Sequence, residues 1–282
     1  MSTKREVERI GSRVFLFSLL NLLTFFGCLV LSLFLFRYIY LARPDSVLND
    51  IPVYSFQLGL GTRLAAAIKA RGWEVDCVVP VPDGSRPAAI QISADLGLPY
   101  REGLVKNRYV GRTFIMPDQR TRELSVRRKL NAMPAVFKGK KVLLIDDSIV
   151  RGTTMSQIVD MVRAAGAAKV YLASASPPVR FPNVYGVDMP SRREFVASDL
   201  SEEEIRSVLG ADGLLYQSVE DLIAVGQALN PSIRRFDAAC FTGEYVTGDV
   251  SVEYLAELEA STRTKARDAR AGQKVSLAAP AA

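Results

Sequence analysis

The sequence predicts an α/β protein, a mainly parallel sheet flanked by helices, preceded by one hydrophobic helix. Short apolar runs alternate with helical patterns along the middle of the chain, and an uncharged stretch of 23 residues runs from Val14 to Phe36. Strand, turn and helix in close succession are typical of βαβ units, and hence of a parallel sheet. With 282 residues, 49% of them hydrophobic, the chain is long enough to bury a substantial core.

The expected elements follow one another in a simple order. Strands are predicted at 77–81, 142–147 and 169–176, and helices from Ser85 (SRPAAIQISADLG), from Thr153 (TTMSQIVDMVRAAGA), and at 201–209, 218–228 and 251–260. Ser201 is the expected N-cap of its helix, because Glu204 three residues later completes a capping box. The segment 261–282 is rich in Ala, Arg and Lys and is predicted to be disordered.

The uncharged stretch defines a first region, 1–37, ahead of the predicted domain at 38–260. As a helix it would measure about 35 Å, enough to cross the roughly 30 Å hydrocarbon core of a bilayer. We therefore predict a membrane-inserted helix over 14–36, and the alternative is a buried helix that is hydrophobic all round. Four basic residues precede the span and two follow it, which would place the N-terminus in the cytoplasm and export the domain.

The composition excludes several classes of chemistry. The chain has no histidine, which removes Ser-His-Asp triads, Cys-His hydrolases and nearly all catalytic zinc sites. Its three cysteines, Cys28, Cys77 and Cys240, are too far apart for a CxxC pair and too few for a four-cysteine metal or iron–sulfur site.

Charge is separated along the chain. Residues 101–141 hold twelve Lys/Arg and three Asp/Glu, whereas residues 186–260 hold five and fifteen. The basic stretch either faces a compact polyanion or simply coats a solvated surface. Because no helix-turn-helix, zinc-finger or aromatic RNA-binding motif accompanies it, no nucleic-acid partner is expected.

The segment VLLIDDSIVRGTT, residues 142–154, carries the clearest chemical pattern. A buried strand ends in two adjacent carboxylates, and a short loop with a glycine and two threonines then opens a helix. Backbone amides at a helix N-terminus suit a phosphate, and carboxylates suit ribose hydroxyls and a magnesium ion. The alternative is that the two aspartates only cap the following helix.

This segment resembles the phosphoribosyl pyrophosphate (PRPP) motif of type I phosphoribosyltransferases. Six further blocks, in order, resemble amidophosphoribosyltransferases: YIYLARPDS at 38–46, VVPVPDGSRPAA at 78–89, LPYREGLVKNRYVGRTFIMP at 98–117, SVRRKLNA at 125–132, RFPNVYGVDMPSR at 180–192 and CFTGEYVTGD at 240–249. The resemblance extends from about Tyr38 to Glu259. It implies the type I phosphoribosyltransferase fold and the reaction that forms phosphoribosylamine from PRPP, the first step of purine synthesis.

The resemblance also implies roles for particular residues. The predicted PRPP-binding residues are Asp83, Asp146, Asp147, Ser148, Val150, Arg151, Gly152, Thr153 and Thr154. The predicted magnesium contacts are Asp146, Asp147, Gly84 and Ser85. Most members of the family carry Ser or Thr at the position of Gly84, and here the hydroxyl lies one place later, at Ser85.

Residues 106–113 match the family's flexible loop, which closes over PRPP and shields the reacting centre from water. The resemblance assigns catalytic roles within it to Lys106, Arg108, Tyr109 and Arg112. The positive charge of this loop suits a pyrophosphate leaving group. The reaction needs little acid–base help, because pyrophosphate bound to magnesium is already a good leaving group.

The family's glutaminase half has no counterpart here, so we expect the chain to use free ammonia or ammonia from a separate glutaminase. The N-terminal segment then belongs to a membrane-anchored synthase half, a truncated gene or a gene-model error. No iron–sulfur cluster is expected, because Phe34 and Asp237 stand at two of the family's ligand positions and only Cys240 remains.

Two functional hypotheses follow. The first is an ammonia-dependent amidophosphoribosyltransferase, and the second is a non-catalytic sensor or truncated pseudoenzyme that binds PRPP or purine nucleotides. We expect a cytoplasmic catalytic domain, a homo-oligomer and inhibition by purine nucleotides. Membrane association is expected only if residues 14–36 are genuine.

Overall fold

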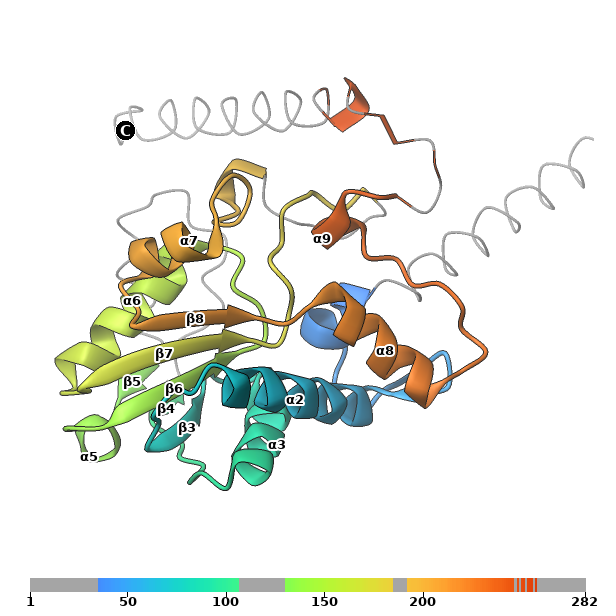
Figure 1. The fold of residues 1–282 in the computed structure, drawn as a ribbon. Coiled ribbons are helices and arrows are strands. Elements are labelled where there is room, and N and C mark those ends of the chain that lie inside the picture. Colours follow the sequence, from blue (N-terminus) through green and yellow to red (C-terminus); the bar gives the residue numbers. More distant parts are fainter. Residues whose placement is uncertain are drawn as a thin grey trace, which may run out of the picture.

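The computed structural model describes residues 35–106, 130–184 and 192–245, together with 248, 250, 251, 253–255 and 257. Its central sheet has four parallel strands in the order β3-β6-β7-β8 (Figure 1). These strands are β3 (Cys77–Pro80), β6 (Lys141–Asp146), β7 (Lys169–Ser174) and β8 (Gly213–Tyr216). Three of the four coincide with strands predicted from the sequence, and β8 was not predicted.

Helices cover both faces of this sheet (Figure 1). On one face, α2 (Val53–Ala70) and α3 (Arg86–Leu96) pack against Val78, Leu143 and Ala173. On the other, α6 (Gly152–Ala164) and α7 (Glu202–Leu209) pack against Val79, Leu144 and Leu172. Side chains of the middle strands are buried on both faces, which explains why these strands read as continuous apolar runs. The predicted parallel sheet flanked by helices is confirmed.

Helix boundaries follow local signals. At α7, Ser201 Oγ accepts from the Glu204 amide, and the Glu204 carboxylate accepts from the Ser201 amide, which confirms the predicted capping box. Helix α8 spans Val219–Leu229, close to its predicted limits. Within the predicted helix 251–260, residues 253–255 and 257 are helical and Ser251 is not. Residues 252, 256 and 258–282 lie outside the described residues.

The side chains packed on the two faces of the sheet form two apolar clusters, and a third apolar cluster lies beyond the carboxyl ends of the strands. There α2 and α8 meet η1 (Arg37–Leu41) and α9 (Ala239–Thr242). Leu35 and Phe36 are 0% and 2% exposed in this cluster, and the ring of Phe36 lies 6.1 Å from that of Phe241. The last two residues of the predicted membrane span are therefore part of the domain core.

Within the residues that the structure describes, no helix is long and apolar enough to cross a membrane. Residues 14–34 of the predicted span lie outside those residues. The described part of the chain therefore gives the membrane helix no support, and the span stays a prediction.

Two small antiparallel ribbons complete the fold. One pairs β1 (Val47–Leu48) with β2 (Ile51–Pro52), and the other pairs β4 (Leu104–Lys106) with β5 (Leu130–Ala132). In the second ribbon, Lys106 pairs with Leu130. The short helix α5 (Pro134–Phe137) follows it and leads into β6.

Candidate PRPP-binding site

The register of β3 and β6 brings two loops together at one edge of the sheet. Pro80 pairs with Ile145, and the Val81 amide donates to the Ile145 carbonyl at 2.8 Å. Because the strands are parallel, the loop 82–85 and the loop 147–151 leave the sheet side by side. In α/β sheets this carboxyl edge is where ligands bind.

Asp146 and Asp147 lie at the end of β6, as the sequence predicted. Asp147 donates its backbone N–H to Asp146 Oδ1 at 3.1 Å, and Ser148 Oγ donates to Asp147 Oδ1 at 3.4 Å. Burial raises the pKa of Asp147 to about 6. Burial also raises the pKa of Asp146 well above its usual range, and the Asp147 charge adds to that rise. Among the described residues, neither carboxylate forms an ion pair. Two half-buried carboxylates side by side therefore form a site that favours binding of a cation.

Gly84 lies directly against this acid pair. A Cβ atom built at Gly84 would lie 2.0 Å from Asp147 Oδ2, so the carboxylate occupies the space that a side chain would need. The magnesium contact predicted for Ser85 stays a prediction. The Ser85 hydroxyl is buried, with the residue 1% exposed, and donates to the Val81 carbonyl at 2.7 Å. The structure brings Gly84 to the acids but directs the Ser85 hydroxyl into the backbone of its own loop.

The turn before α6 connects the acid pair to a helix N-terminus. Arg151 has an extended backbone, α6 begins at Gly152, and Thr153 and Thr154 are exposed in the first turn. The first amides of a helix have no partner within it, and the side chain of the N-cap residue Arg151 does not accept a hydrogen bond from them. The predicted phosphate-binding residues thus share one exposed turn, although Ser148 itself is buried.

A neighbouring segment braces that turn, which the sequence did not predict. Val196 donates its N–H to the Val150 carbonyl at 3.0 Å, and Arg151 Nε lies 2.7 Å from Glu194 Oε2. A Cβ atom at Gly152 would lie 2.8 Å from Val196 Cγ2. Glu194 is part of η2 (Arg192–Glu194), and no local pattern in the sequence links it to a loop more than forty residues earlier.

A group of charged side chains lies beside the 82–85 loop. Asp83 accepts from Arg86 at 2.8 Å and from Lys106 at 2.7 Å, and Arg86 also donates to Glu102 at 3.1 Å. The hydrogen bond from Lys106 is the main reason that the pKa of Asp83 lies below its usual range. Of the predicted catalytic residues, Lys106 is brought to this loop, whereas Arg108, Tyr109 and Arg112 lie outside the described residues.

Asp237 and Cys240 stand at positions for which the sequence analysis considered an iron–sulfur cluster. Cys240 is buried in the third apolar cluster, and Asp237 is buried beside it. Burial raises the pKa of both groups. Phe34 lies outside the described residues. No set of three or more Cys, Asp or Glu side chains in the described part of the chain is arranged to hold a metal.

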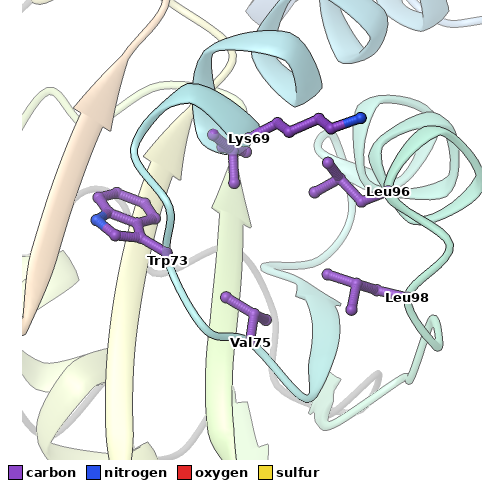
Figure 2. A pocket seen from close by; sticks show the side chains of 6 residues that line it. Lys69, Trp73, Val75, Leu96 and Leu98 are labelled. Carbon is purple, nitrogen blue, oxygen red and sulfur yellow. The ribbon is translucent and has the colours of Figure 1, made fainter.

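A separate hollow of about 180 Å³ lies between the C-terminal ends of α2 and α3. Figure 2 shows Lys69, Trp73, Val75, Leu96 and Leu98 around it. Trp73 and Val75 precede β3, whereas the acid pair follows the parallel strand β6. The hollow is therefore at the opposite end of the sheet, and none of the predicted site residues lines it.

The chain is similar to several known proteins. Residues 58–176 match the phosphoribosyl transferase domain family. The chain is 56% identical over 224 residues to the amidophosphoribosyltransferase of Escherichia coli, covering 78% of this chain and 44% of that protein. It is 50% identical over 253 residues to the amidophosphoribosyltransferase of Haemophilus influenzae, covering 88% of this chain and 50% of that protein.

Among solved structures, the chain is similar to glutamine PRPP amidotransferase from B. subtilis complexed with ADP and GMP. The identity is 43%, the TM-score is 0.67, and the match covers 79% of this chain and 49% of that one. The fold is thus the type I phosphoribosyltransferase fold, and the resemblance seen in the sequence motifs is confirmed. The chain spans about half the length of the curated relatives it matches.

Proposed function

We propose that this chain, which is homologous to the phosphoribosyltransferase half of amidophosphoribosyltransferases, transfers ammonia to C1 of PRPP and releases pyrophosphate. The product is 5-phosphoribosylamine. One observation supports this most directly: the acid pair at the end of β6 stands between the 82–85 loop and the open turn of α6. A ribose carrying a 5′-phosphate on one side and a pyrophosphate on the other fits that order of groups.

Each part of the site has a distinct task in this proposal. Asp146 and Asp147 accept hydrogen bonds from the ribose hydroxyls. The amides at the start of α6 and the hydroxyls of Thr153 and Thr154 bind the 5′-phosphate, and the positive end of the helix dipole favours that charge. The Arg151–Glu194 ion pair holds the turn in place for this contact.

Magnesium fits the acid pair. Burial raises the pKa of both carboxylates, neither forms an ion pair with another of the described residues, and oxygen ligands are those that magnesium prefers. Two carboxylates leave most of the coordination sphere to oxygens of the substrate and to water, which is usual for magnesium bound with a phosphate ligand. When bound, the metal would neutralise the departing pyrophosphate. Asp146 and Asp147 would hold it, and Gly84 would bring only backbone atoms near it.

The leaving group meets positive charge from the chain itself. Lys106 lies at the 82–85 loop, through its bond to Asp83, and its ammonium group would stabilise the charge that develops on pyrophosphate. The predicted catalytic roles of Arg108, Tyr109 and Arg112 remain part of the proposal. No general base is required of the described residues, because ammonia is itself the nucleophile.

Ammonia would be either free or supplied by a separate glutaminase. The B. subtilis relative was solved with ADP and GMP, and we extend to this chain inhibition by purine nucleotides. Assembly into a homo-oligomer and a cytoplasmic location of the catalytic domain complete the proposal. If residues 14–36 insert into a membrane, fractionation of cells would find the chain in the membrane pellet after a high-salt wash.

The test is pyrophosphate release by the purified full chain with PRPP, magnesium and ammonium. The full chain is used because Leu35 and Phe36 are buried in the core. We expect release that depends on ammonium and does not occur when glutamine replaces it. Binding of PRPP without any ammonium-dependent release would reject the transferase and favour a sensor.

A further inference from the structure

Four charged side chains form a connected group beside the 82–85 loop. Asp83 Oδ1 accepts from Arg86, Asp83 Oδ2 accepts from Lys106, and Glu102 holds Arg86 from the other side. Two acids and two bases cancel, and the four side chains are between 41% and 52% exposed. Water reaches all of them, so these ion pairs can exchange partners at little cost.

The two cations on Asp83 are not equivalent. Arg86 is shared between Asp83 and Glu102, whereas Lys106, among the interactions of the described residues, pairs with Asp83 alone. If Lys106 left, Asp83 would keep its ion pair with Arg86, and the group would carry one net negative charge. Lys106 is therefore the cation that the group can give up.

Asp83 is poorly suited to bind an anion directly. It lies next to Gly84, in the loop that faces the acid pair, and an anion bound there would be repelled by a free carboxylate. In this structure both carboxylate oxygens are already occupied by cations. An anion arriving at the loop therefore competes with Asp83 for Lys106.

We propose that Asp83 is an internal counterion that holds Lys106 in the ligand-free protein and gives it up to pyrophosphate. This inference rests on the proposed function and sharpens it, since Asp83 becomes a positioning residue for Lys106 and not a ligand of PRPP. The same exchange in reverse, with Lys106 returning to Asp83, assists the release of pyrophosphate.

The experiment is a double-mutant cycle read by calorimetric binding of magnesium pyrophosphate to the full chain. The four proteins are the unmodified chain, Asp83→Asn, Lys106→Met and the double variant. We expect Asp83→Asn to tighten binding about three- to fivefold, the range of an exposed ion pair, because Lys106 is then free beforehand. We expect no such gain in the Lys106→Met background.

The cycle separates this proposal from simple repulsion. If Asp83→Asn tightens binding equally with and without Lys106, the carboxylate only repels pyrophosphate and the counterion role is refuted. If Asp83→Asn weakens binding, Asp83 is a ligand and the role is refuted as well. Glu102→Gln is the matched control: it removes a charge from the same group without touching Lys106, and affinity should stay within about twofold.

Failure here is distinguishable from failure of the proposed function. Ammonium-dependent pyrophosphate release by the unmodified chain, together with an additive cycle, would refute only the counterion role. Absence of both pyrophosphate binding and release would refute both. Since the side chains changed are exposed and the ion pair contributes at most about 1 kcal/mol, we expect the unfolding temperatures of the four proteins to agree within about 5 °C.

Discussion

Replacing Asp147 by asparagine should stabilise the ligand-free protein while damaging its binding of magnesium and PRPP. Burial raises the pKa of this carboxyl from 3.8 to about 6, so the ionised form is disfavoured in the folded state. At 1.36 kcal/mol per unit, the shift corresponds to about 3 kcal/mol. Because Asp147 is partly open to solvent and its charge also raises the pKa of Asp146, we expect the variant to gain about 1–3 kcal/mol at pH 8.

The sign of the pH dependence follows from proton binding. Between pH 3.8 and about 6 the folded state holds the proton and the unfolded state has lost it, so stability falls as pH rises through this window. Above pH 6 the full cost of the charge is present. The advantage of Asp147→Asn should therefore be largest near pH 8, decline below pH 6, and disappear toward pH 3.8.

The assay is urea unfolding of both proteins in EDTA at pH 8 and at pH 4.5, followed by calorimetry with magnesium and PRPP. We expect at least about tenfold weaker PRPP binding by the variant, the loss of one charge-assisted contact. Equal stability of the two proteins at pH 8 would refute the account of the acid pair as an uncompensated charge. Unchanged PRPP affinity would remove Asp147 from the site.

Three further changes test other parts of the site and fold. Gly84→Ala should displace the Asp147 carboxylate and weaken magnesium-dependent PRPP binding in calorimetry by about tenfold. The unfolding free energy should change by less than about 1 kcal/mol, because the flexible end of a side chain can move. Unchanged affinity would contradict the close approach. Glu194→Gln should leave Arg151 unpaired and raise the KM for PRPP about two- to fivefold in the release assay, and an unaltered KM would show that the brace is unnecessary. Gly61→Ala should lower the free energy of unfolding in urea by about 1–3 kcal/mol, because the new methyl would lie 2.8 Å from a carbonyl oxygen of α3. A higher urea concentration at the unfolding midpoint would show that the gain in helix propensity outweighs the clash.

The central strands and their loops could be predicted because their signals are local. In β6, four successive apolar residues are buried on both faces, and the acids and the glycine turn follow within a few residues. Such a pattern needs no knowledge of distant contacts. The capping box at Ser201 was predictable for the same reason.

Other elements lacked such signals. Helix α2 begins after Pro52 without a side-chain cap and contains Gly59 and Gly61, which lower helix propensity. These glycines are required by close approach to Val225 and to α3, a tertiary reason that a single helix does not reveal. Strand β8 has only four residues, all buried, and a short apolar run of that length is ambiguous between strand and helix.

The sequence predicted the local parts of the candidate site but not the ion pairs that join them to distant segments. The acid pair and the turn of α6 could be identified, whereas the ion pairs of Arg151 with Glu194 and of Asp83 with Lys106 join residues 43 and 23 positions apart. Ser85 shows the converse. The sequence places a hydroxyl in this loop, but its hydrogen bond to the Val81 carbonyl depends on backbone geometry that the sequence does not show.

The close approach of Gly84 to Asp147 makes these two positions epistatic. A side chain at 84 is tolerated only if the carboxylate at 147 adopts another rotamer, and a shorter residue at 147 would in turn make room at 84. Substitutions at the two positions should therefore combine non-additively. Directed evolution of this site has to explore both codons together, because a library that varies one of them samples only variants constrained by the other.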